Sequence, residues 1–99
     1  MSTHTPIPVA RAQRQIAHNL DLARRQQRVT MDVLADRANI SVPTLRRLLN
    51  TGAGSLENYL RVVRILGLLD TTVAASDPLN TPLGRLRADE DTPKRVRKG

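Results

Sequence analysis

Residues 29–49, VTMDVLADRANISVPTLRRLL, place polar residues where helices begin and apolar residues at helical spacing. Thr30 can cap a first helix, because its hydroxyl accepts a hydrogen bond from a first-turn N–H group. Asp32 follows where the positive end of the helix dipole favours a carboxylate. These features predict a short helix over Met31–Ala38.

A second helix is predicted after a turn of about four residues. Asn39 tolerates the left-handed conformation that closes a helix, Ser41 can cap the next one, and Pro43 fits its first turn. At helical spacing, one side of residues 42–50 is apolar and carries Leu45, Leu48 and Leu49. The opposite side carries Pro43, Arg46, Arg47 and Asn50. The second helix therefore has a core side and a basic side.

Composition limits the rest of the molecule. The chain has 99 residues, no cysteine and one aromatic residue, so its core must consist of Leu, Val, Ile and Ala, as short packed helices allow. This length suits one small domain with tails and excludes a large enzyme core. We therefore predict an all-α chain: a compact bundle of about five short helices, containing a helix-turn-helix and ending in an extended basic tail.

A strong positive charge narrows the choice of partners. Sixteen Lys and Arg residues against nine Asp and Glu residues give a formal net charge of +7. Such a chain favours nucleic acid, an acidic protein or an anionic membrane surface. Its basic residues are spread over several short helices and not along one amphipathic face, which argues against the membrane surface.

Further helical segments flank the central pair. Residues 9–27 repeat apolar side chains at helical spacing, namely Val9, Ala12, Ile16, Leu20 and Ala23. Ser55 can cap another helix over residues 56–66, whose apolar side chains cover most of its circumference and therefore need burial on more than one side. A short helix is predicted from Asp70 to about Ser76.

The two ends of the chain differ in composition from this domain. We expect a flexible start over residues 1–8, a domain over 9–76, and an extended or disordered tail over 77–99, where prolines and charges replace large apolar residues. The tail ends in a basic cluster formed by Lys94, Arg95, Arg97 and Lys98. These charges can follow DNA phosphates, dock on an acidic partner or only provide solubility.

The central segment resembles the helix-turn-helix of Xre/Cro-like transcriptional regulators, and the similarity extends from about Ile16 to Leu69. The matching positions are Thr30, Leu34, Ala35, Ala38, Ile40, Ser41, Leu45 and Leu48. Residues 55–70 and 93–97 resemble more narrowly the HipB-type antitoxins. The resemblance implies a protein that binds a HipA-like kinase toxin and represses their shared promoter as a dimer.

Four positions depart from the family pattern. Two of them, Asn39 and Thr51, are often held by Gly. Met31 stands where many members have a Gln that contacts phosphate or base, so that polar contact is lost. Leu49 stands where many have a Glu that pairs with an Arg matching Arg24. Arg24 is therefore expected to be solvated or to meet phosphate.

The motif and its side-chain chemistry predict a set of DNA contacts. They are Thr30, Ser41, Val42, Pro43, Thr44, Arg46, Arg47 and Asn50. Arg47 matches a base-reading position of the family, and an arginine can donate two hydrogen bonds to guanine. Ser41 and Thr44 can bind phosphate or a base edge. Val42 and Pro43 can contact a thymine methyl group. The alternative for the arginines is a solvated helix face.

Surplus apolar surface on residues 56–66 predicts a two-fold dimer interface. Its candidate residues are Val62, Ile65, Leu66 and Leu69. Such a dimer would place two recognition helices about one DNA turn, roughly 34 Å, apart. The alternative is that these side chains complete the core of one protomer.

The expected function is sequence-specific repression of transcription by a homodimer on double-stranded DNA, as the antitoxin of a type II toxin–antitoxin pair that represses its own promoter. The alternative is a neutraliser of a HipA-like kinase toxin, with DNA binding secondary. No catalytic residue, metal or cofactor is expected, because the two histidines and the tail acids lack a scaffold that would hold them together. The sequence shows no membrane span or signal peptide, so we expect a cytoplasmic protein, on the nucleoid when DNA-bound.

Overall fold

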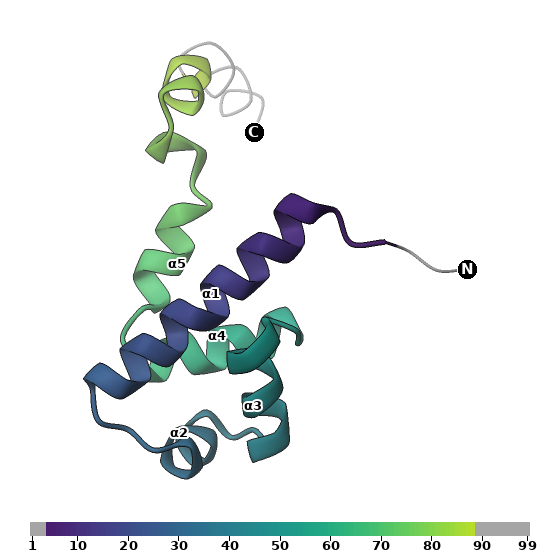
Figure 1. Cartoon of the computed structure of the whole chain (residues 1–99). Coiled ribbons are helices and arrows are strands. Elements are labelled where there is room, and N and C mark those ends of the chain that lie inside the picture. Colours follow the sequence, from purple (N-terminus) through teal and green to yellow (C-terminus); the bar gives the residue numbers. More distant parts are fainter. Residues whose placement is uncertain (1–3, 89–99) are drawn as a thin grey trace. The chain divides into compact units, whose positions relative to one another are not determined.

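The computed structural model describes residues 4–88. Within this range every regular element is helical, which confirms the predicted all-α class. The chain divides into an amino-terminal unit, Met1–Leu68, and a carboxyl-terminal unit, Leu69–Gly99. Figure 1 labels the helices of both units. The amino-terminal unit contains the candidate functional residues of the helix-turn-helix.

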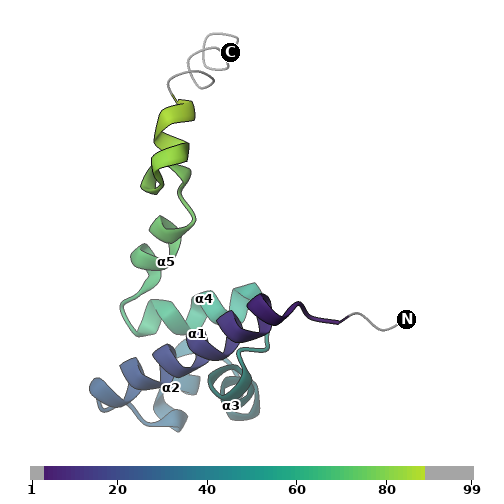
Figure 2. The ribbon, with the colours of Figure 1, turned by 45° about the horizontal axis from the view of Figure 1, so that its top comes forward.

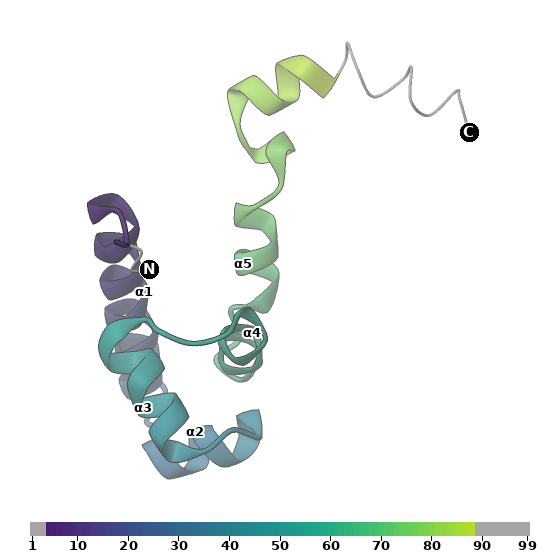
Figure 3. The ribbon, with the colours of Figure 1, turned by 90° about the vertical axis from the view of Figure 1, so that its right-hand side faces the viewer.

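Helix α1, Ile7–Gln26, begins before the predicted start at Val9, within the segment expected to be flexible. Proline in a first turn favours this, since it fixes a helical φ and leaves no N–H unpaired. The core-facing residues of α1 are Ala17 and Leu20. The predicted apolar stripe is therefore covered only in part, because Val9 is 49% and Ile16 is 39% exposed. Figures 1 and 3 show the first turns of α1 extending beyond α3 and α4.

Two short helices follow, α2 over Met31–Ala38 and α3 over Val42–Thr51. The Oγ1 of Thr30 accepts a hydrogen bond of 3.2 Å from the backbone N–H of Val33, which confirms the predicted cap of α2. The bounds of α2 agree with the prediction, and α3 extends one residue further. Figure 2 shows α2 and α3 on the same side of α1.

The turn between α2 and α3 depends on Asn39 and Ser41. Asn39 has the left-handed conformation, with φ 57° and ψ 48°, and ends α2 as predicted. The backbone N–H of Ile40 donates to the carbonyl of Ala35 at 3.0 Å, which pairs one of the last free carbonyls of α2. Ser41 then caps α3 by accepting a 3.2 Å hydrogen bond from the N–H of Thr44. The helix-turn-helix is therefore fixed by local hydrogen bonds.

The core of the amino-terminal unit is aliphatic. Its largest fully buried side chains are Leu34, Leu45, Val62 and Val63, from α2, α3 and α4 (Leu56–Ile65). Helix α1 packs on α3, and α2 packs on both α3 and α4. The leucines predicted to face the core from α3 are all buried, namely Leu45, Leu48 and Leu49. Full burial of such a side chain contributes about 1.5–3 kcal/mol, so these three set the orientation of α3 about its axis.

Arg24 holds the end of α1 to the start of α2. Its side chain is only 17% exposed and pairs with Asp21, with 2.9 Å between Nη2 and Oδ1. Its Nη1 also donates to the carbonyl of Val29 at 2.9 Å. The expectation that Arg24 is solvated or meets phosphate is therefore wrong, because the fold itself satisfies its guanidinium group.

The carboxyl-terminal unit contains helix α5 (Leu69–Ala75), a 3₁₀ turn (Pro78–Asn80) and a helical run over residues 82–88. The prediction of an extended tail is therefore wrong for residues 77–88. The basic cluster predicted to make tail contacts lies outside the described residues; its members are Lys94, Arg95, Arg97 and Lys98.

Proline accounts for the helical turns of the carboxyl-terminal unit. Pro78 is the first residue of the 3₁₀ turn, and Pro82 is the first residue of the following helical run. At the first position of a helix the missing N–H costs no hydrogen bond. The side chains of Asp77 and Thr81 cap these turns by accepting backbone hydrogen bonds of 2.9 Å each. The prolines therefore start helical turns in this unit and do not mark an extended segment.

Candidate nucleic-acid interface

Helix α3 turns a basic face to solvent. Because its leucines are buried, the residues on the opposite side are exposed: Pro43, Arg46, Arg47 and Asn50. Val42 and Thr44 at its start are half-buried. Within residues 4–88, no carboxylate forms an ion pair with Arg46 or Arg47. Both guanidinium groups can therefore meet an external anion without breaking a salt bridge.

Hydroxyl groups at the start of α3 form a local network. The Oγ of Ser41 accepts from the N–H of Thr44 at 3.2 Å and donates to Oγ1 of Thr44 at 2.7 Å. The Ser41 hydroxyl is thus used within the fold, whereas the Thr44 hydroxyl keeps its own hydrogen for an acceptor such as a phosphate oxygen. Thr30 likewise accepts from Val33 and keeps a hydrogen to donate. Of these predicted contacts, the structure favours Thr44 and Thr30 over Ser41.

A recess of about 380 Å³ lies beside the outer face of α3. It is lined by Pro43, Thr44, Arg47, Ala53, Gly54, Ser55 and Asn58. Thr44 belongs to the first turn of α3, and Ser55 caps α4 by accepting a 3.0 Å hydrogen bond from the N–H of Asn58. The positive ends of two helix dipoles and the charge of Arg47 therefore border one recess. This arrangement favours an anion.

Ser55 and Asn58 were not predicted as contact residues from the sequence, which assigned Ser55 only a capping role. The sequence feature that could have identified them is the short connection between α3 and α4, residues 52–55. A link of this length keeps the start of α4 close to α3. Which side of α3 faces α4, however, follows from the packing of the whole unit.

The predicted dimer residues do not form an exposed surface. Val62 is 0% and Leu66 is 3% exposed, and both Ile65 and Leu69 are half-buried. Val62 and Leu66 are therefore wrong as contacts to a second copy, because their side chains are already covered within one protomer. The alternative reading, that they complete a core, accounts for their burial.

Neither a metal-ligand cluster nor a membrane-spanning helix occurs within residues 4–88. In that range, no group of three His, Cys, Asp or Glu side chains is placed to hold a metal ion. None of the described helices is long and apolar enough to cross a membrane. Comparisons with protein families, with curated proteins and with solved structures find no match to this chain. The side chains around α3 are therefore the basis for assigning a function.

Proposed function

We propose that this chain binds double-stranded DNA sequence-specifically by placing α3 in the major groove. The observation that carries the proposal is the two-sided character of α3, with its leucines buried and Arg46, Arg47 and Asn50 exposed. The major groove of B-DNA admits a single α-helix, and side chains on its outer face then reach the base edges. A rigid helix held by a capped turn is suited to this task.

Each exposed group has a part in the proposed complex. Arg47 offers two parallel N–H donors to O6 and N7 of guanine, and Asn50 can pair with adenine. Thr44 and the recess beside Arg47 offer donors and positive potential to a phosphate. The net charge of +7 adds affinity that does not depend on sequence. The base-edge contacts are therefore the source of specificity in this proposal.

The resemblance to HipB-type antitoxins extends the proposal to a biological role. The chain would act in the cytoplasm as a repressor of its own promoter, by occupying DNA that the transcription machinery needs. A HipA-like kinase toxin would be its protein partner. Repression of this kind requires no catalysis and no cofactor.

Fluorescence anisotropy with two duplexes tests the proposal. One duplex carries the DNA directly upstream of the gene, and the other is a scrambled duplex of equal length. At about 150 mM salt we expect the upstream duplex to bind at least about 10³-fold more tightly. Equal affinities that fall together as salt rises would show that charge alone binds phosphate, and would make toxin neutralisation the better function.

A further inference from the structure

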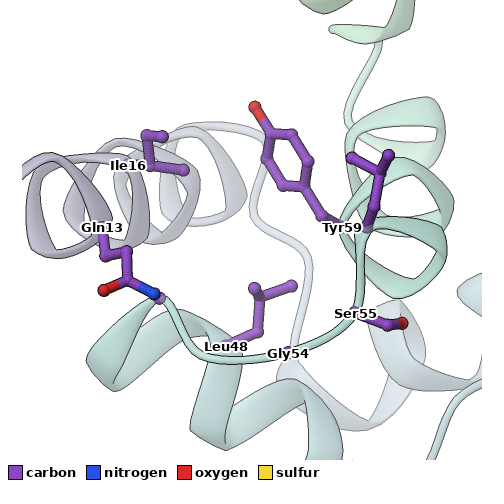
Figure 4. Close-up of a pocket in the computed structure, with 8 residues that line it drawn as sticks. Gln13, Ile16, Leu48, Gly54, Ser55 and Tyr59 are labelled. Carbon is purple, nitrogen blue, oxygen red and sulfur yellow. The ribbon is translucent and has the colours of Figure 1, made fainter. Parts of the chain in front are cut away.

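A pocket of about 170 Å³ lies where α1, the end of α3 and the start of α4 meet. Its apolar lining is formed by Ile16, Leu48, Leu56 and Tyr59, and we call it the Tyr59 pocket. Figure 4 shows Ile16 and Tyr59 on opposite sides of the pocket, with Leu48 below them. Leu48 is only 3% exposed and belongs to the core side of α3. The pocket therefore lies on the side of α3 opposite to its basic face.

The lining of the Tyr59 pocket carries no charge. An ion would lose its hydration there without gaining a partner of opposite charge, so the pocket favours a neutral molecule. Two polar groups of the lining remain available to such a molecule. Among residues 4–88, neither the side-chain amide of Gln13 nor the hydroxyl of Tyr59 is engaged in a hydrogen bond. The pocket can therefore bind one polar substituent besides apolar surface.

The size of the Tyr59 pocket limits what can enter it. A cavity of about 150 Å³ between aliphatic and aromatic side chains is large enough to bind benzene. At about 170 Å³, this pocket has room for one six-membered ring with a short substituent. The ring of Tyr59 offers its face or edge to an aromatic ring. A single aromatic ring with one small polar group fits these walls best.

The Tyr59 pocket shares a wall with the recess beside Arg47. Gly54 and Ser55 line both of them. The start of this wall is held to the last turn of α3 by Thr51. The Oγ1 of Thr51 donates to the carbonyl of Arg47 at 2.8 Å and accepts from the N–H of Ala53 at 3.1 Å. Contacts made in the pocket therefore act on the same short segment that borders the recess.

We propose that the Tyr59 pocket binds a small neutral aromatic molecule with one hydrogen-bonding substituent, and that this ligand strengthens binding to the upstream duplex. The pocket and the recess exist in the same conformation of the chain. A ligand in contact with Gly54 and Ser55 stabilises that conformation. By linkage, DNA bound at the recess and the ligand then raise each other's affinity. The ligand site does not depend on the proposed function, whereas its effect on DNA rests on it.

Nuclear magnetic resonance of the methyl-labelled full chain, titrated with phenol without DNA, tests the site. Phenol combines one aromatic ring with one hydroxyl group and is neutral at about pH 7. We expect it to shift the methyl resonances of Ile16, Leu48 and Leu56, with a dissociation constant on the order of 1 mM. The methyl resonances of Val33, which does not line the pocket, should stay unchanged.

Three variants locate the bound phenol. Ile16→Trp should raise the dissociation constant at least about 10-fold, because the larger side chain fills the pocket. Ile16 is 39% exposed, so the fold can accept this change, and helical circular dichroism checks that it does. Val9→Trp is the matched control, since it adds the same side chain to the same side of α1 outside the pocket. Gln13→Leu should raise the dissociation constant about 3- to 10-fold by removing a hydrogen-bond partner.

The site is supported if phenol shifts the three lining residues in the wild type and in Val9→Trp but not in Ile16→Trp. It is overturned if these resonances do not move, or if Ile16→Trp binds phenol as the wild type does. The same shifts caused by rising protein concentration alone would also overturn it, because a side chain of another copy would then fill the pocket. Unchanged phenol binding by Gln13→Leu would overturn the assigned hydrogen bond.

The effect on DNA is measured by anisotropy with saturating phenol. We expect the upstream duplex to bind at least about 5-fold more tightly to the wild type and to Val9→Trp, with no change for Ile16→Trp. If the wild type prefers the upstream duplex but phenol leaves its affinity unchanged, the coupling is overturned. If the upstream and scrambled duplexes bind equally with and without phenol while the methyl shifts persist, the proposed function fails and the ligand site stands.

Discussion

Replacing Gly52 by alanine is expected to lower the free energy of unfolding by at least about 3 kcal/mol. Gly52 ends α3 with φ 76°, a conformation that costs an L-residue about 1–2 kcal/mol. An added Cβ would also lie 2.3 Å from the carbonyl oxygen of Gln13 in α1. Because that atom belongs to helix backbone, the clash is relieved only by separating α1 from α3.

Thermal unfolding measures this effect. One kcal/mol corresponds to about 4–8 °C for a domain of this size, so the midpoint for Gly52→Ala should fall by at least about 12 °C. Gly67→Ala is the matched control, because Gly67 has φ 77° but nothing within 4 Å of the added Cβ. Gly67→Ala should lose only the backbone contribution, about 1–2 kcal/mol. Equal losses in both variants would contradict the close approach of α3 to α1.

Replacing Arg47 by alanine is expected to weaken binding to the upstream duplex about 10- to 100-fold and to remove discrimination at one base position in each half-site. The side chain is exposed and forms no ion pair within residues 4–88, so stability should not change. Arg11→Ala is the matched control, since it removes the same charge from the exposed side of α1. Arg11→Ala should weaken binding to the upstream duplex and to the scrambled duplex slightly and equally.

Affinities for a panel of duplexes with single base-pair changes give the readout for Arg47→Ala. At one base position the variant should bind all four base pairs with equal affinity. At the other positions the order of preference for the base pairs should stay as in the wild type. If Arg47→Ala keeps every base preference of the wild type, the assignment of Arg47 to base reading is refuted, and its charge serves only the phosphates.

Local chemistry explains what could be predicted from the sequence. Thr30 and Ser41 each cap a helix through a hydrogen bond to a residue three positions later, so the information lies within one turn. Asn39 ends α2 by a conformation that few other residues adopt. The buried side of α3 followed from helical spacing alone. The helix-turn-helix and its exposed basic residues were therefore accessible without a structure.

Coverage of a helix face, in contrast, depends on tertiary packing. Val9 and Leu20 share one apolar side of α1, yet Val9 is 49% exposed and Leu20 is 4% exposed. Helical spacing shows that the two residues share a side of α1. How far along α1 this side is buried depends on the positions of α3 and α4. The burial of Val62 and the pairing of Arg24 within the fold also depend on tertiary structure. Each depends on a residue distant in the sequence or on a loop conformation.

The candidate site was likewise predicted in part. The outer residues of α3 were identified as a group, whereas the recess that Arg47 shares with Ser55 and Asn58 exists only because α4 starts beside α3. The division of roles between Ser41 and Thr44 also needed the structure, since either hydroxyl could have remained unbonded.

Binding of DNA by the outer face of α3 is tested most directly by nuclear magnetic resonance. The ¹⁵N-labelled chain is titrated with the upstream duplex, and changes in amide chemical shift are mapped onto the sequence. The largest changes are predicted at Thr44, Arg46, Arg47, Ser55 and Asn58, with little change at Arg11 and His18 on the far side of α1. Changes confined to residues 77–99, or spread evenly over all basic segments, would contradict the proposal that α3 enters the major groove.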